Sequence, residues 1–190
     1  MTDKHLSETE RSILLRLARQ SIEAAATGNR SYRVDPEQIP EILKRNGASF
    51  VTLTNQGALK GCIGTLEAYQ PLFLDVIEHA SAAAVEDYRF NPVRPEEVGN
   101  IHIEISVLTQ PEQLRYEGTE DLLQCLRPGI DGVVIKDGRS RATFLPQVWD
   151  QLPDKQDFLS HLCSKMGAPA GLWKIKNLAV FTYQVEDFHE

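Results

Sequence analysis

The chain has 190 residues, of which 42% are hydrophobic and 25% are charged, and its formal net charge is −7 at pH 7. This composition is that of an ordinary globular protein, and no stretch approaches the roughly 18 apolar residues that a membrane span needs. The chain is acidic and has no block of Lys and Arg residues that would neutralise the phosphates of a nucleic acid. We therefore expect neither membrane insertion nor nucleic-acid binding.

The N-terminus opens directly into a polar, acidic helix start without the apolar core of a signal peptide, which indicates a cytoplasmic protein. The three cysteines, Cys62, Cys125 and Cys163, are odd in number and widely spaced. We expect from them no disulfide framework and no structural zinc site. An iron–sulfur cluster needs several closely placed thiolates, and the histidines show no ligand spacing. The sequence therefore predicts no metal and no cofactor.

The first half of the chain predicts two helices, then two strands, then a long helix. Ser7 and Glu10 have the capping-box spacing of a helix start, and Pro71 begins a long helix with a small-residue face. Asn46-Gly47 readily takes left-handed backbone angles, so we expect a short helix to end there. The predicted elements are a helix over 7–28, a short helix between about 35 and 46, strands over 49–54 and 59–65, and a helix from residue 71.

The second half predicts mostly strands. Residues 101–108 alternate with period two, so one face is buried and His102, Glu104 and Ser106 share the other. Asp137-Gly138 fits the turn of a hairpin over 133–144. An amphipathic helix over 154–166 and strand material over 173–185 follow. Strands joined by short turns, with helices at irregular places, predict an α+β fold with a largely antiparallel sheet and flanking helices.

The most informative local feature is Gly61-Cys62-Ile63-Gly64, in the second predicted strand. Two glycines in a strand indicate a bulge or a close backbone approach, which would let a substrate come near Cys62. A thiol is a nucleophile only as the thiolate, and the helix from Pro71 could favour that form by directing its N-terminus toward the turn. Alternatively, Cys62 is a small buried hydrophobe between glycines that shape the backbone.

Two further segments place polar groups among apolar ones. Asp87-Tyr88-Arg89-Phe90 follows the long helix, and Arg89 could clamp a carboxylate or a phosphate through its planar fork. Alternatively, Asp87 and Arg89 cap the helix and pin the loop. Glu104 lies mid-strand between isoleucines, where it could act as a base or a ligand, or be a solvated outward residue.

Taken together and in order, six segments resemble the AMMECR-domain family, whose prokaryotic members are called AmmeMemoRadiSam system protein A. They are Phe50–Leu53, Leu59–Leu66, Asp87–Phe90, Ile103–Leu108, Thr143–Val148, and Phe158–Leu159 with Lys165–Gly167. The resemblance covers roughly residues 10–188. It implies one compact domain of two closely packed subdomains, with residues 1–9 as a lead-in. Lys60 stands where relatives commonly have Arg, which keeps the charge but loses the planar fork.

The resemblance also implies a cleft around the cysteine motif, in which Cys62 and Glu104 are the candidates for catalysis. The residues expected to line this cleft are Lys60, Gly61, Cys62, Gly64, Asp87, Arg89 and Glu104. The resemblance further implies association with a Memo-like protein, related to non-haem dioxygenases, and with a radical S-adenosylmethionine protein. It supplies no settled catalytic activity.

We therefore expect an accessory protein that binds a small substrate or a partner segment in the cleft. The alternatives are a cysteine-dependent enzyme, an interaction scaffold and a nucleic-acid-linked regulator. The sequence predicts no particular oligomeric state.

Overall fold

The computed structural model describes residues 5–29 and 32–190, which divide into two compact units. The first unit extends to Thr109 and also contains Glu186–Glu190, and the second comprises Gln110–Val185. The chain thus leaves the first unit, builds the second, and returns with its last strand. Each unit has a hydrophobic core of its own.

The described elements of the first unit are α1 (Glu8–Ala26), η1 (Pro36–Gln38), β1 (Asn46–Asn55), β2 (Ala58–Gly64), β3 (Gln70–Pro71), α2 (Leu72–Val85), η2 (Pro95–Asn100), β4 (Ile101–Leu108) and β9 (Val185–His189), whose first residue is the last of the second unit. Those of the second unit are β5 (Glu112–Gln113), α3 (Gly118–Cys125), β6 (Gly132–Asp137), β7 (Ser140–Phe144), η3 (Pro146–Asp150), α4 (Lys155–Lys165), α5 (Leu172–Ile175) and β8 (Ala179–Tyr183).

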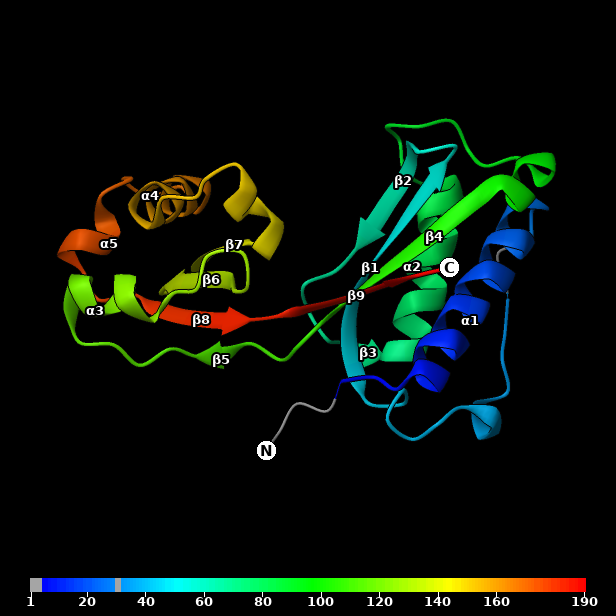
Figure 1. Cartoon of the computed structure of the whole chain (residues 1–190), viewed down its shortest axis with the longest axis horizontal. Coiled ribbons are helices and arrows are strands. Elements are labelled where there is room, and N and C mark those ends of the chain that lie inside the picture. The colour runs from blue at the N-terminus through cyan, green and yellow to red at the C-terminus, as the bar shows by residue number, and fades with distance from the viewer. Residues whose placement is uncertain (1–4, 30–31) are drawn as a thin grey trace. The chain divides into compact units, whose positions relative to one another are not determined.

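The sheet of the first unit has the strand order β2-β1-β4-β9, and β3 pairs with the start of β1. The ladders of β1 with β2 and with β4 are antiparallel. Helices α1 and α2 pack against each other and against this sheet (Figure 1), and they share one core with the buried strand residues. Among the described elements of this unit, the other face of the sheet carries no α-helix, so it is called the open face below.

The second unit has its own antiparallel sheet, with the order β5-β8-β6-β7. Its core contains the apolar side of α4, as the spacing of residues 154–166 predicts. Trp149 stacks on Phe158 with ring centroids 3.6 Å apart, and its indole N–H donates to the Asp131 carbonyl at 2.7 Å. The two sheets and their helices confirm the predicted α+β fold.

Two local expectations were wrong. The short helix is only the three-residue η1, and Asn46-Gly47 begins β1 instead of ending a helix. A Cβ on Gly47 would lie 2.8 Å from Cβ of Leu72, so this glycine serves the close approach of α2. Trp173 lies in α5, and the last strand material is divided between β8 and β9, which belong to different sheets.

The predicted close approach at the cysteine motif is confirmed. A Cβ on Gly61 would lie only 2.0 Å from the carbonyl oxygen of Ala83 in α2, and one on Gly64 would lie 2.4 Å from the Ser49 carbonyl oxygen. The β1–β2 register also shifts next to Leu53, as a bulge requires. Both glycines are therefore needed where they stand, because α2 and β1 occupy the space of a side chain.

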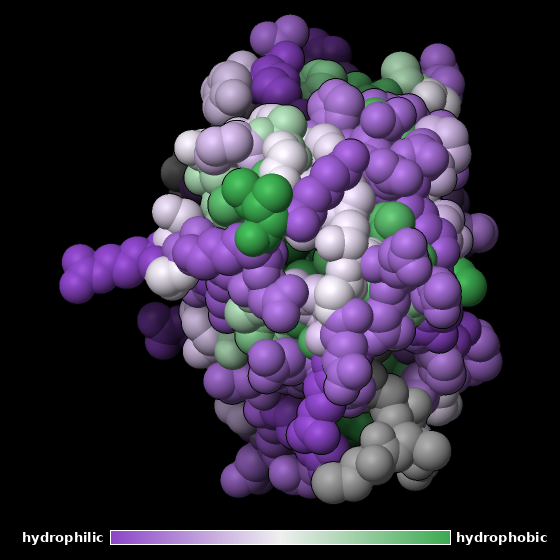
Figure 2. Space-filling view, turned by 90° about the vertical axis from the view of Figure 1, so that its left-hand side faces the viewer, coloured by the Kyte–Doolittle hydropathy of each residue, from purple (hydrophilic) through white to green (hydrophobic). Residues whose placement is uncertain are grey.

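The molecular face in Figure 2 is mostly hydrophilic, and its hydrophobic side chains lie in small separate patches. Patches of this kind are common on the surfaces of folded proteins and do not by themselves mark an interface. None of the helices in the described ranges is long and apolar enough to cross a membrane.

The contact between Gly61 and α2 predicts a large cost for a single methyl group. Gly61→Ala should lower the free energy of unfolding by about 3 kcal/mol in urea denaturation, because β2 or the end of α2 must move. Gly99→Ala is the matched control, since a Cβ there meets no atom within 4 Å. Equal stability of the two variants would contradict this close packing.

Candidate functional site

Cys62 lies on β2, an edge strand of the first sheet, and projects from the open face. Successive side chains of a strand point to opposite faces. Gly61 faces α2, so Cys62 faces away from it. Across the ladder Cys62 pairs with Thr52 of β1, whose hydroxyl donates to the Cys62 sulfur at 3.3 Å. The thiol is half-buried and is fixed against its neighbouring strand.

The carboxylate of Asp87 and the guanidinium of Arg89 bind the main chain of Cys62 from outside the sheet. Asp87 Oδ2 accepts the Cys62 N–H at 2.9 Å, and Arg89 Nη2 donates to the Cys62 carbonyl at 3.0 Å. These two contacts take the positions that a further strand would occupy. They therefore block the exposed edge of β2 at this residue.

Asp87 and Arg89 also form a two-point ion pair with each other. Arg89 Nε and Nη2 donate to the two carboxylate oxygens of Asp87 at 2.9 and 2.7 Å, and the Arg89 N–H adds a third bond at 3.2 Å. The hydrogen bonds from Arg89, helped by the Cys62 N–H, hold the pKa of Asp87 well below its ordinary value despite burial. The same pairing raises the pKa of Arg89. Asp87 is thus a buried, permanently charged anchor at neutral pH.

Of the two interpretations of Arg89, the structure shows the pinned loop directly. Its fork is occupied by Asp87 instead of being open for a ligand. The Arg89 side chain is nevertheless 47% exposed, whereas that of Asp87 is 2% exposed. The outer edge of the guanidinium therefore remains accessible to a ligand.

The Lys60 side chain forms an ion pair with Glu97. Its ammonium group donates to Glu97 Oε1 at 3.1 Å, and both side chains are mostly buried. Glu97 also accepts the Arg94 N–H, which is the largest cause that lowers the pKa of Glu97 to about 2, followed by the bond from Lys60. The positive charge of Lys60 is therefore neutralised within this cluster.

Glu104 shares the open face with Cys62 but does not touch it. Thr52 pairs with Cys62 on one side and with Glu104 of β4 on the other. Two strand spacings separate the backbones of Cys62 and Glu104 by about 10 Å. The structure thus brings Cys62, Asp87 and Arg89 together, and places Glu104 two strands away in the same transverse row.

Sequence reasoning missed Thr52 and Glu97, which contact the predicted site residues. Pairing residues outward from the turn between the two predicted strands would have identified the cross-strand neighbour of Cys62. The register shift next to Leu53 makes that pairing fail by one residue before it reaches Thr52. No local pattern connects Glu97 to Lys60, since they lie 37 positions apart.

The orientation proposed for the long helix was wrong. Gly61 lies against Ala83, in the last turns of α2, whereas Leu72 at its first turn lies against Gly47. The C-terminal end of α2, with its partial negative charge, is therefore the end near the cysteine motif.

Among the described residues no histidine or carboxylate is hydrogen-bonded to the Cys62 sulfur. These residues therefore provide no paired base for a nucleophile of the Cys–His kind.

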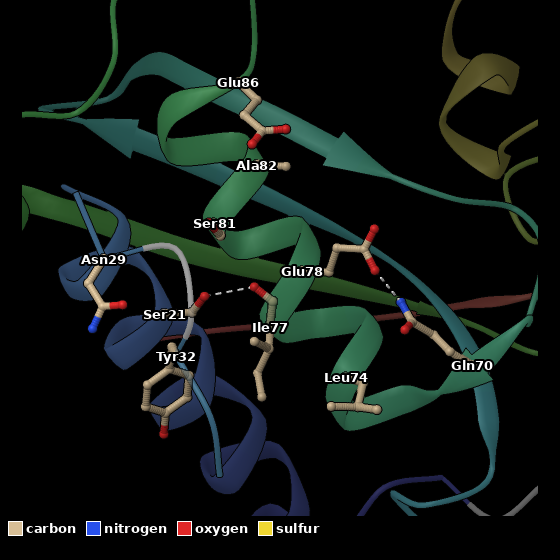
Figure 3. A pocket seen from close by; sticks show the side chains of 10 residues that line it. All are labelled: Ser21, Asn29, Tyr32, Gln70, Leu74, Ile77, Glu78, Ser81, Ala82 and Glu86. Carbon is tan, nitrogen blue, oxygen red and sulfur yellow. Dashed lines mark hydrogen bonds between the residues drawn. The ribbon is translucent and has the colours of Figure 1, made fainter. Parts of the chain in front are cut away.

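Two hollows lie elsewhere on the surface. One, of about 420 Å³, lies along α1 and α2, where Ser21 donates to the Ile77 carbonyl and Gln70 donates to Glu78 (Figure 3). The other, of about 550 Å³, lies in the second unit and is lined by residues such as Arg115 and Tyr116. Neither is lined by a predicted site residue. The described residues contain no group of three His, Cys, Asp or Glu that could hold a metal ion.

The anchor role of Asp87 predicts a defined loss of stability. Asp87→Asn should lower the free energy of unfolding at pH 7 by about 1–2 kcal/mol, because charged hydrogen bonds are lost while Arg89 stays partly solvated. The depressed pKa contributes stability above the ordinary aspartate pKa of about 4, and this contribution is lost as the pH falls further. The difference between the two proteins should therefore shrink below about pH 4.

Asp137→Asn serves as the control, since Asp137 pairs with an exposed Lys176 at 2.7 Å. That surface pair should contribute well under 1 kcal/mol. A constant difference between wild type and Asp87→Asn across the acid range would contradict the assignment.

Comparison with known proteins identifies the fold and the family. A protein of Methanothermobacter thermautotrophicus is 38% identical over 186 residues, which cover 97% of this chain and 96% of the relative. A protein of Methanosarcina acetivorans is 36% identical over 188 residues, with 97% and 94% covered. The crystal structure of an uncharacterized protein from Pyrococcus horikoshii superposes with a TM-score of 0.78 at 33% identity, covering 97% of this chain and 93% of that one. The AMMECR1 family model matches residues 15–188. The chain therefore belongs to the AMMECR1 family, as the resemblance of its ordered segments predicts.

Proposed function

We propose that this AMMECR1-family protein is an accessory protein that binds a small substrate or an extended partner segment beside Cys62. In this proposal it acts together with a Memo-like protein and a radical S-adenosylmethionine protein. The observation that carries the proposal is the double contact of Asp87 and Arg89 with the main chain of Cys62. This contact holds one thiol and one half-exposed guanidinium in fixed relative positions.

The surface beside Cys62 has the residue types that commonly anchor partners. Tyr88, between the two anchors, is 96% exposed, and a fully exposed tyrosine gains contact area when a partner covers it. Arg89 packs its guanidinium 5.4 Å from the Phe90 ring centroid, which reduces the entropy that it loses on binding. Tyrosine and arginine dominate the binding energy of many interfaces.

The charges beside Cys62 favour a ligand that is neutral or carries a single carboxylate. Asp87 balances the charge of Arg89, and Glu97 balances that of Lys60. Among the contacts of the described residues, Nη1 of Arg89 has no partner. It can therefore donate to one carboxylate or amide oxygen of a bound segment.

Co-purification with purified Memo-like and radical S-adenosylmethionine partners tests the proposal. Tyr88→Ala and Cys62→Ala should each reduce the recovered partner at least about ten-fold if these residues contribute in the manner of interface anchors. Tyr88 is almost wholly exposed, so its replacement should leave the melting temperature unchanged and isolate the binding effect. Metabolite analysis of the purified complex identifies a small ligand in the same experiment.

Cys125→Ala is the matched control, because Cys125 is a half-buried thiol of the second unit. Equal recovery with all three variants would show that any scaffold role uses another surface. Failure of the wild type to retain either partner would overturn the partnership.

A further inference from the structure

Two histidines from strands far apart in sequence meet on the open face of the first sheet. His102 of β4 and His189 of β9 have ring centroids 5.3 Å apart, with ring planes at 48°. Both side chains are exposed. The histidines show no ligand spacing along the sequence, where 87 positions separate this pair, and only the pairing of β4 with β9 brings them together.

A carboxylate lies beside this pair. The Glu190 N–H donates to the Ile103 carbonyl at 3.2 Å, and the Ser106 hydroxyl donates to Asp187 at 2.5 Å. Both contacts fit a single antiparallel register, in which Glu104 lies opposite His189. Glu104 thus lies next to one histidine across the ladder and next to His102 along β4, on the same face of the sheet.

The ring separation suits a shared metal ion. With a zinc–nitrogen bond of about 2.0–2.1 Å and a ring radius of roughly 1.2 Å, an ion lies about 3.2 Å from each ring centroid. Centroids 5.3 Å apart then subtend an angle of roughly 110° at the ion, close to the tetrahedral value. Both rings are exposed, so rotation about their side-chain bonds can aim a nitrogen of each at that point.

One of the two rings has a main-chain oxygen beside its Nδ1. His189 Nδ1 lies 2.9 Å from the main-chain oxygen of Glu190. A metal-binding histidine usually donates its second ring N–H to a carbonyl or carboxylate, which fixes the tautomer and leaves the other nitrogen for the ion. In the tautomer with the proton on Nδ1, His189 Nε2 is the nitrogen left for an ion. In the described part of the chain, the His102 ring has no hydrogen-bond partner that competes with an ion.

We propose that His102 and His189 bind a divalent transition-metal ion of the class that prefers imidazole, such as Zn²⁺ or Cu²⁺. Two histidines supply the protein ligands and water completes the coordination, since the described residues hold no three-ligand group. The carboxylates of Glu104 and Asp187 offset the charge of the ion. This site goes beyond the proposed function, and it lies at the opposite end of the row that begins at Cys62.

Titration of the untagged full chain with Zn²⁺ in a calorimeter tests the site. Wild type should bind one ion, and His102→Ala and His189→Ala should each weaken that binding at least about ten-fold. Cu²⁺ should give an electron paramagnetic resonance spectrum with two coordinated nitrogens, and each variant should lose one of them.

His161→Ala is the matched control, because His161 is an exposed histidine whose Nδ1 also lies near a carbonyl oxygen, that of Asp157, at 2.9 Å. It should leave the affinity unchanged, and so should Cys62→Ser, which excludes zinc capture by the thiol. No binding by wild type, or equal weakening by His161→Ala, would overturn the proposal. Neither result would bear on partner recovery at Cys62, so the two proposals fail independently.

Discussion

The buried carboxylate of Asp87 connects the parts of the first unit on which the candidate site depends. It accepts the Cys62 N–H and three donors of Arg89, and its own carbonyl accepts the Phe90 N–H at 3.1 Å. Through these bonds the loop after α2 is attached to the edge of β2. The attachment works only because Gly61 lets β2 approach the end of α2. A charge that is 5% exposed is stable in this position only with such a complete set of donors.

This arrangement explains the cysteine motif without assigning it a reaction. The glycines on either side of Cys62 provide space for α2 and for β1, and the thiol takes a hydrogen bond from Thr52. A thiol held in this way has a fixed position, and no histidine or carboxylate of the described residues is hydrogen-bonded to it. A fixed, half-buried thiol beside an exposed tyrosine and arginine fits recognition better than nucleophilic attack, which is why binding is the function proposed.

Much of the fold could be predicted because its signals are local. Ser7 forms the expected capping box with Glu10, Asp154 caps α4, and Gly167 just beyond the end of α4 has a positive φ. The direction in which α2 crosses the sheet could not be predicted, because it depends on which glycine meets which turn of the helix. The assignment of β8 and β9 to separate sheets was likewise hidden, since a single residue separates the two strands and no turn signal divides them.

For the site, the structure brings Cys62, Asp87 and Arg89 into contact, and the cleft that the resemblance implies around them stays a prediction. The partner of Lys60 and the neighbours of Glu104 escaped prediction, because Glu97 and His189 are distant in sequence and no periodicity connects them. The pairing of Glu104 with His189 follows from the strand order, whereas Glu97 lies in η2 and reaches Lys60 only through the tertiary fold. The alternation of residue types along one strand therefore predicts which residues share a face of the sheet. It does not predict which residues of neighbouring strands lie beside each other.

The central claim is that Asp87 and Arg89 bind the main chain of Cys62 and so fix the site. Native-state hydrogen exchange of the Cys62 amide measures this contact directly, because an unpaired amide on an edge strand exchanges rapidly. The account predicts that the Cys62 amide is strongly protected in the wild type and loses most of that protection in Asp87→Ala. Rapid exchange in the wild type, at the rate of an open strand edge, would contradict the account.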